Sequence, residues 1–197
     1  MEWATTSTLL RDLRDYDNHA AWQQLAERFR KPIVAFARGM GFAQIDAEDV
    51  AQETLIAFAE AFRKQQFDPS RGRLSNWMFG IAYRQALGHR RREGRHATPA
   101  ADIGGATTLM GNVPDEQAAS GVWDVEWEQA LLRECLERVK TEVEPQTFEA
   151  FEHVVCFGKS AEEAAAAMSV PIKLVYNAKH RILKRVRELR AELEDLA

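Results

Sequence analysis

Apolar residues recur at helical spacing along most of the chain, and no stretch shows the sustained alternation of a β-strand. Residues 20–38 carry the first apolar stripe, in which Pro32 makes a bend or a boundary possible. A second helix is expected to begin at Asp46, with Asp46 and Asp49 as a capping pair. Its core face is expected to contain Val50, Thr54, Ile56, Ala57, Ala61 and Phe62.

A turn and a third helix follow in this half of the chain. Residues 67–72 have the composition of a turn, and the next helix is expected from about Leu74 to Arg92. Helical periodicity then fails over residues 93–121, where glycines and prolines are frequent and large apolar residues are few. This composition is typical of a flexible linker. The inward residues of the third helix are expected to be Trp77, Met78, Ile81, Ala82 and Leu87.

Helical patterns resume at Val122, with one helix expected over residues 123–140. Glu144-Pro145 can start the next helix, because proline suits the first helical position, and Gly158 is expected to end it. A short alanine-rich helix to Met168 is expected to follow.

The last two helices are expected to form a helix-turn-helix. Ser160 and Glu163 form a capping box that opens the short helix, and residues 169–172 form a tight turn. The long final helix has one apolar face, made of Leu174, Val175, Ala178, Ile182, Leu183, Val186 and Leu189. The chain is therefore predicted to be all-α, with two small helical domains at residues 1–95 and 122–197 and a flexible linker at residues 96–121.

Composition excludes several classes of protein. The 197 residues are 46% hydrophobic and 28% charged, which is ordinary for a globular protein. No apolar stretch is long enough for a signal peptide or a membrane span, so a cytoplasmic protein is expected. Cys135 and Cys156 have no zinc-ligand spacing and are expected to be buried free thiols. No catalytic, metal or cofactor motif is present, so a non-catalytic protein is expected.

Charge changes this picture, because the net charge of −4 is unevenly distributed. Residues 71–95 and residues 171–190 each carry seven Lys or Arg against one Glu, while residues 96–170 carry fourteen acidic residues against four basic ones. Two separate basic segments on an acidic chain indicate two contacts with one long polyanion. The alternative for each segment is a solvated helix face.

The predicted helix-turn-helix has the features that DNA recognition requires. Small residues at 161 and 164–167 allow close helix packing, and the following helix has a cationic outer face suited to the major groove. Similar helix pairs also occur in proteins that do not bind DNA. The residues expected to reach base edges are Lys173, Tyr176, Asn177, Lys179 and His180, and those expected near phosphates are Arg181, Lys184, Arg185 and Arg187.

The segment at 46–95 combines an acidic helix start with an aromatic, arginine-rich helix. Aromatic rings interleaved with arginine suit single-stranded DNA, because rings stack on exposed bases while guanidinium groups follow the backbone. Phe79 and Tyr83 lie on a similar face, whereas Trp77 is expected in the core. The acidic side chains of Asp46, Glu48, Asp49 and Glu53 do not favour DNA, so they need either their own helix terminus or a basic protein surface.

These residues resemble a known family. Asp46-Ala-Glu-Asp-Val-Ala-Gln-Glu-Thr-Leu55, Asn76-Trp-Met-Phe-Gly-Ile-Ala-Tyr83 and Arg90-Arg-Arg92 resemble region 2 of bacterial sigma factors. The helix-turn-helix after the linker resembles region 4. A chain with these two regions alone is similar to the extracytoplasmic-function subgroup.

The resemblance implies a role for each segment. Asp46, Glu48, Asp49, Gln52 and Glu53 match the helix that docks on the clamp helices of the largest RNA polymerase subunit. Residues 77–92 match the segment that recognises and melts the −10 promoter element, and residues 63–73 match the loop that holds a flipped base. Residues 171–187 match the helix that reads the −35 duplex, and the linker is expected to run toward the RNA exit path. The residues expected to contact −10 DNA are Arg71, Arg73, Phe79, Tyr83, Arg84, His89, Arg90, Arg91 and Arg92.

The chain also departs from the family's pattern. Arg84 and Gly88 stand where the family often has Asn and Asp, and Tyr176 and Ala178 stand where it often has Lys or Arg. A −35 sequence different from that of typical relatives is therefore expected. Thr54 is interpreted as a buried helix threonine rather than a modification site.

The resemblance implies core RNA polymerase, including its flap region, and promoter DNA as partners. Control is expected to act in trans, through an anti-sigma factor, a regulatory kinase or abundance, because no sensor domain is attached. Two alternatives remain open from the sequence: a conventional helix-turn-helix regulator that binds duplex operator DNA without polymerase, and an interaction protein that holds polymerase or an inhibitor.

Overall fold

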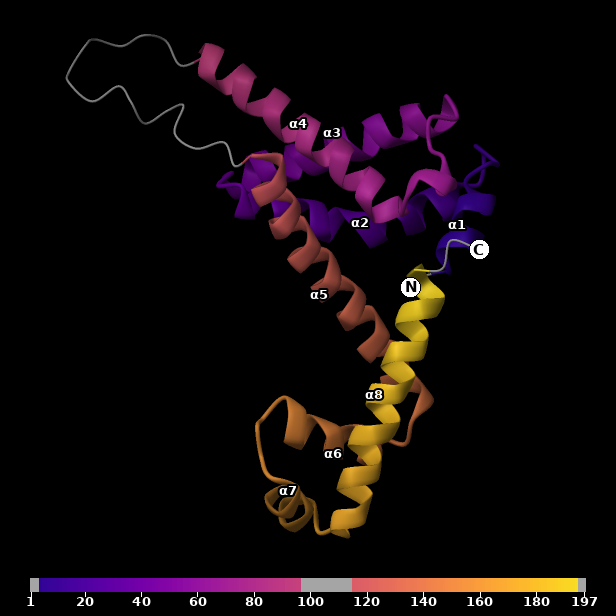
Figure 1. Ribbon diagram of the computed structural model, residues 1–197, viewed down its shortest axis with the longest axis vertical. Helices are drawn as coiled ribbons and strands as arrows, with labels where there is room; N and C mark the ends of the chain where they lie inside the picture. Colours follow the sequence, from indigo (N-terminus) through magenta and orange to yellow (C-terminus); the bar gives the residue numbers. More distant parts are fainter. Residues whose placement is uncertain (1–3, 97–114, 195–197) are drawn as a thin grey trace, which may run out of the picture. The chain divides into compact units, whose positions relative to one another are not determined.

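The computed structural model describes residues 4–96 and 115–194, and every regular element within these ranges is helical. This confirms the predicted all-α fold. The elements, shown in Figure 1, are α1 (Thr6–Asp12), α2 (His19–Gly39), α3 (Gln44–Arg63), the 3-10 turn η1 (Pro69–Arg71), α4 (Leu74–His96), α5 (Glu116–Glu142), α6 (Pro145–Val155), α7 (Ala161–Met168) and α8 (Ile172–Glu194).

The helices fall into two compact units that divide within α5. The N-terminal unit is Thr6–Ala130, and the C-terminal unit takes up the chain at Leu131. The sequence placed the start of the second domain at residue 122 instead. The assignment of a function to each domain stays a prediction. Residues 97–114, which make up most of the predicted linker, lie outside the described residues.

The N-terminal unit is a bundle in which α2 and α4 both pack against α3. Its core holds Phe29, Ile33 and Phe36 of α2 together with Phe58 of α3 and Met78 of α4, all of them buried. Pro32 is also buried, and α2 continues through it without a break. Large apolar side chains from three helices therefore meet in one core, and their burial supplies most of the stability of such a unit.

The first half of α5 belongs to this unit. Trp123 is only 1% exposed, and its ring centroid lies 5.8 Å from that of Phe36 and 6.1 Å from that of Phe79. The ring of Trp127 stacks on Phe29, with centroids 4.9 Å apart. Two tryptophans thus attach the start of α5 to α2 and α4.

The C-terminal unit has a large core and a smaller one. The large core joins the second half of α5 to α6 and α8, and the smaller one fits α7 closely against α8 through alanines. Ser160 caps α7, because its hydroxyl accepts from the backbone N–H of Glu163 at 3.1 Å and the Glu163 carboxylate accepts from the Ser160 N–H at 2.8 Å. The predicted capping box is confirmed. The large core consists of Leu131, Cys135, Val139, Phe148, Phe151, Ile182, Val186, Leu189 and Leu193.

Several expectations about local structure were wrong. α3 begins at Gln44 rather than Asp46, and its N-cap is Ala43, which has no side-chain cap; Asp46 lies in the first turn, where a carboxylate suits the helix dipole. Ile56 is 52% exposed, because it lies on the outer face of α3 instead of the core face. Cys156 is exposed, since it follows the end of α6, whereas Cys135 is buried as expected.

Two helical segments were not expected. α1 is a seven-residue helix with few local signals, and it is held by the burial of Leu9 and of Leu13, which follows it. α5 begins at Glu116, so residues 116–121 are helical although their composition resembled that of the linker. Within the described residues, none of the helices combines the length and the apolar character that crossing a membrane requires.

Candidate nucleic-acid and protein interfaces

The acidic residues of α3 divide into paired and unpaired side chains. Glu48 lies 2.8 Å from a guanidinium nitrogen of Arg30 on α2, and Glu53 lies 2.6 Å from one of Arg92 on α4. Asp46 lies 3.7 Å from Nε2 of His89 on α4. The basic partner that the sequence required is therefore partly supplied by the chain itself.

Asp49 and Gln52 lie on the outer face of α3 and are exposed. Among the residues that the structure describes, neither one makes an ion pair or a side-chain hydrogen bond. Ile45, 75% exposed, and Ile56 continue the same stripe at helical spacing. We call Ile45, Asp49, Gln52 and Ile56 the α3 outer face. It combines two apolar side chains with one carboxylate and one amide, a composition suited to a protein partner.

Thr54 lies on the opposite side of α3. It is buried, and its hydroxyl donates a hydrogen bond to the carbonyl oxygen of Val50 at 2.7 Å. This placement confirms its interpretation as a buried helix threonine.

The aromatic residues of α4 are less accessible than the sequence indicated. Phe79 is 9% exposed, because its ring packs against those of Phe36 and Trp123, and it stacks on Tyr83 with ring centroids 5.9 Å apart. Tyr83 is half-buried. Phe79 therefore has no free ring face for a base in this arrangement. Trp77 is half-buried against Phe58 and Phe67, at 4.9 and 5.0 Å between ring centroids.

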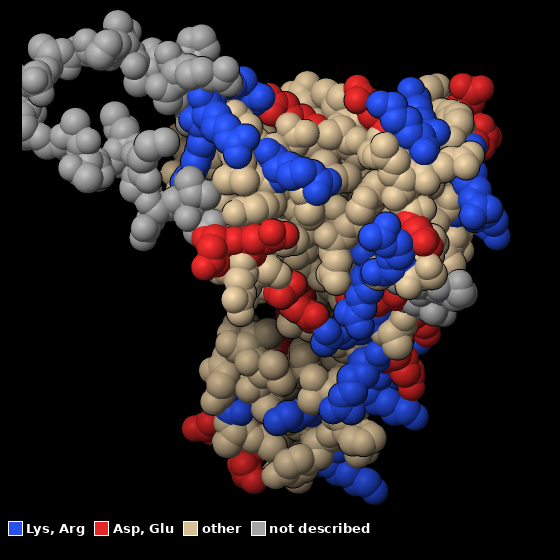
Figure 2. Space-filling view, turned by 45° about the horizontal axis from the view of Figure 1, so that its top comes forward, with Lys and Arg blue, Asp and Glu red and all other residues tan. Residues whose placement is uncertain are grey.

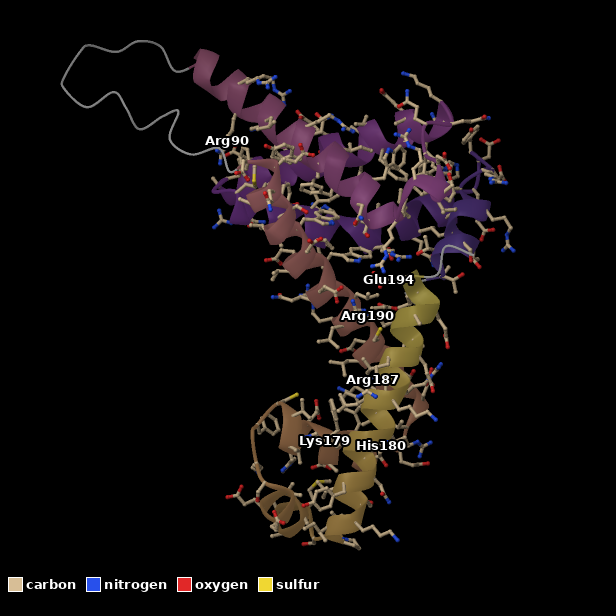
Figure 3. The ribbon with its side chains drawn as sticks, in the orientation of Figure 1. Arg90, Lys179, His180, Arg187, Arg190 and Glu194 are labelled. Atoms are coloured by element: carbon tan, nitrogen blue, oxygen red, sulfur yellow. The ribbon has the colours of Figure 1, made fainter. Side chains whose placement is uncertain are left out.

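The basic side chains predicted to contact −10 DNA also separate into two groups. Arg71, Arg73, Arg84, Arg91 and Arg92 are exposed. Arg90 instead donates a hydrogen bond to the carbonyl oxygen of Met40, and its guanidinium lies over the ring of Phe42, 5.0 Å from the centroid. Figure 3 labels Arg90. His89 also lies against Phe42, at 5.7 Å between ring centroids. Arg90 and His89 thus join α4 to the segment that connects α2 and α3.

The η1 turn that presents Arg71 is held by Asp68. The Asp68 carboxylate accepts hydrogen bonds from the hydroxyl of Ser70 at 2.7 Å and from its backbone N–H at 2.9 Å. These two hydrogen bonds lower the pKa of the Asp68 carboxyl, and the bond from the Ser70 hydroxyl has the larger effect. Gly72 follows with a φ of 148°, in the region that favours glycine. The loop is thereby fixed by local interactions, with both Arg71 and Arg73 exposed.

All seven residues predicted to read −35 DNA are exposed on α8. Helical spacing puts Lys173, Asn177, His180 and Lys184 on one face, while Lys179 falls nearer the buried side. Lys and Arg side chains lie along this part of the surface (Figure 2), and Lys179 and His180 are labelled in Figure 3. The seven residues are Lys173, Tyr176, Asn177, Lys179, His180, Arg181 and Lys184.

A shallow hollow lies between the start of α8 and the first turn of α6. Lys173, Asn177 and Arg181 line it from α8, and Thr147 lines it from α6. Thr147 was not expected from the sequence, because its position depends on how α6 packs against α8. The hollow brings three of the predicted DNA-contacting residues together.

Arg185 is engaged elsewhere, although the sequence placed it near phosphates. Its guanidinium contacts Glu142 of α5 at 2.7 Å and Glu192 at 3.0 Å. The hydrogen bond with Glu142 is the main reason why the pKa of Arg185 is raised and that of Glu142 is lowered. Arg185 therefore connects α8 to α5 within the C-terminal unit.

The contacts of Arg90 generate a prediction about stability. Replacement Arg90→Ala removes a charge-assisted hydrogen bond and a cation–π contact, which together contribute about 2–4 kcal/mol. We expect faster amide hydrogen exchange in α2 and α4 of this variant. Arg84→Ala is the matched control, because Arg84 is exposed on the same helix. Equal exchange rates in both variants would show that Arg90 does not stabilise the unit.

Residues 25–96, which span α2 to α4, match the family model of Sigma-70 region 2. The ECF RNA polymerase sigma factor RpoE of Cereibacter sphaeroides is 26% identical over 181 residues, covering 91% of this chain and 92% of that protein. The segment that matches the family model contains the α3 outer face and the arginine-rich α4, and the similarity to the relative covers most of the chain. Residues 25–96 are therefore similar to region 2 of sigma factors, and most of the chain is similar to an extracytoplasmic-function RNA polymerase sigma factor.

Proposed function

We propose that this protein is a sigma factor that binds core RNA polymerase through the α3 outer face, contacts the melted −10 strand through α4 and the η1 loop, and reads the −35 duplex with α8. Its overall task is to direct promoter-specific transcription initiation, as the similarity to sigma factors implies. The partners are core polymerase and promoter DNA, so the protein acts where transcription takes place, in the cytoplasm. In this proposal the protein itself has no catalytic role, and the polymerase carries out the catalysis.

The α3 outer face carries the docking part of this proposal. Three neighbouring carboxylates have partners on α2 or α4, whereas Asp49 is left available beside Gln52. Ile45 and Ile56 add apolar area at either end of the stripe. A basic helical surface with apolar contacts complements this face, and the clamp helices of the largest subunit are the partner that the family resemblance implies.

The two DNA contacts are supported by different arrangements of charge. In the N-terminal unit, exposed arginines lie on the η1 loop and along α4, which suits the backbone of a single strand. In the C-terminal unit, α7 and α8 form a capped helix pair with an exposed cationic face, which suits a major groove. A conventional operator-binding regulator would use the second surface alone and leave the α3 outer face without a role.

Run-off transcription with purified protein and core polymerase tests the whole proposal. A library of promoter fragments supplies templates, and transcripts are sequenced to locate their start sites. We expect discrete start sites that require this protein. Tight binding to duplex DNA with no dependence on polymerase would contradict the proposal and favour the operator-binding alternative.

Replacement Asp49→Arg tests the docking surface. It reverses the one unpaired charge on the α3 outer face, so we expect loss of binding to core polymerase with both units still folded. Binding is measured by co-purification with core, and folding by circular dichroism. Glu60→Arg is the matched control, because it makes the same charge change at an exposed position near the other end of α3. Normal core binding by the Asp49 variant would show that the partner contacts another surface.

Replacements in α8 test how the −35 element is read. Asn177→Ala removes a side chain suited to a base edge, so we expect a loss of about 1–3 kcal/mol at one base pair and relaxed specificity there. Lys184→Ala is expected to weaken binding to all sequences to a similar extent, because a lysine late in α8 is suited to a phosphate. Initiation from a library of −35 variants measures both effects. A uniform loss for both replacements would exclude Asn177 as a base-reading residue.

A further inference from the structure

The first half of α5, residues 116–130, contacts the N-terminal unit through a single narrow stripe. Four of its residues are buried at helical spacing: Ala119, Trp123, Trp127 and Ala130. Two of these are alanines, so the tryptophans supply nearly all of the apolar contact area. The remaining faces of this half-helix are largely polar and exposed, including Asp124 and Gln129. We call residues 116–130 the α5 cover.

The α5 cover approaches α2 very closely at one point. A Cβ atom built on Gly39, the last residue of α2, would lie 2.6 Å from Cγ1 and 3.9 Å from Cβ of Val122. A separation of 2.6 Å is too short for two carbon atoms in contact, so only glycine permits this approach. The position of the cover therefore depends on a specific residue of α2.

The α5 cover lies over the aromatic pair of α4. Trp123 lies against Phe79, whose ring stacks on Tyr83. Phe79 and Tyr83 are the rings that the sequence assigned to an unpaired base, yet Phe79 is buried beneath Trp123. Removal of the cover would uncover this ring at the surface of the helix that carries the exposed arginines.

The contact between the α5 cover and the N-terminal unit leaves a buried polar group of Trp123 without a hydrogen bond in the described part of the chain. The Nε1 atom of Trp123 is buried, and within the described part of the chain it has no hydrogen-bond partner. A buried N–H without an acceptor opposes the covered state, because water would satisfy that group once the indole is released. The α5 cover thus combines a large apolar contact with a polar penalty that its release removes.

We propose that the α5 cover is a detachable segment that occupies the site of the unpaired −10 base, and that it must leave α2 and α4 before Phe79 can stack on that base. This inference rests on the proposed role of α4 in −10 recognition. The cover and the strand compete for one aromatic surface, so the apparent affinity for the strand is reduced to the fraction of molecules with the cover released. Release of the cover is then a step of initiation.

A disulfide can hold the cover in place. The separation of 3.9 Å between the built Cβ of Gly39 and Cβ of Val122 lies within the range that a disulfide requires. The variant is Gly39→Cys with Val122→Cys, in a background with Cys156→Ser because Cys156 is exposed. The oxidised and reduced forms of one protein then differ only in whether the cover can leave.

The disulfide variant is assembled with core polymerase and tested on a pre-melted −10 template that lacks a −35 element. We expect the oxidised holoenzyme to bind this template at least ten-fold more weakly than the reduced one, and dithiothreitol to restore binding. Core binding is expected to be equal in both forms, since the α3 outer face is not part of the cover's contact. Equal template binding by the two forms would overturn the proposal.

The experiment distinguishes failure of the α5 cover proposal from failure of the proposed −10 role of α4. Equal, tight binding by both forms overturns the α5 cover and leaves the −10 assignment of α4 intact. A different result is that both forms and the wild-type holoenzyme bind core polymerase but not the pre-melted template. This result overturns the −10 assignment of α4, and with it the proposed competition between the α5 cover and the strand. The template lacks a −35 element, so a change in the reach of the C-terminal unit does not affect the result.

Replacement Gly39→Ala provides the opposite perturbation. The added Cβ meets Val122, so we expect the α5 cover to loosen, with amide exchange in residues 116–130 at least ten-fold faster and tighter binding to the pre-melted template. The matched control is Gly39→Ala with Val122→Ala, which removes the atom that clashes and is expected to restore both values. Faster exchange without tighter template binding would show that the cover does not compete with the strand, and so would overturn the proposal.

Discussion

The contact of Phe36 with rings from two other helices is the interaction on which the N-terminal unit depends. Phe36 lies edge-on to Phe79 of α4 and to Trp123 of α5, and all three side chains are buried. Truncation of a buried phenylalanine costs about 3–5 kcal/mol, a large part of the stability of a small domain. The same ring therefore supports α4, the helix that we propose contacts −10 DNA, and also packs against Trp123 of the segment that covers it.

Internal ion pairs determine which charges remain for partners. Arg30, His89 and Arg92 take up carboxylates of α3, and Glu142 with Glu192 takes up Arg185 of α8. In the first half of α3, what remains is the exposed carboxylate of Asp49 beside the amide of Gln52, and on α8 it is the exposed face that carries Lys173, Asn177 and His180. A surface with few free charges in defined positions favours specific recognition over general attraction. A wrong partner leaves these charges without a complement, and this weakens its binding.

Features with local signals could be predicted from the sequence. The capping box at Ser160 and the helix start at Pro145 are set by residues within one turn of each other, so they are readable without the fold. The location of Asp46 within α3 was misjudged, because an acidic residue near a helix start serves either as a cap or as a first-turn carboxylate. α1 gave almost no local signal, since its stability comes from the packing of Leu9 against other elements.

The accessibility of the site residues could not be predicted in the same way. Helical spacing correctly paired Phe79 with Tyr83, but it could not show that Trp123, from a distant segment, lies over Phe79. Likewise nothing near Arg90 in the sequence indicates that it bonds to Met40, whereas Arg84 on the same helix stays exposed. Burial is decided by contacts between elements, and a single sequence carries little information about those.

The ion pairs of Arg185 have a consequence for how the C-terminal unit responds to salt. Protein–DNA affinity falls with salt in proportion to the number of phosphates that cations neutralise, because each contact releases condensed counterions. The segment 171–190 carries seven Lys or Arg, but Arg185 and Arg190 already face glutamates of their own unit. A cation that keeps its carboxylate displaces no counterion from DNA. We therefore expect the ionic-strength sensitivity of the proposed −35 binding to be weaker than the number of basic residues in α8 suggests.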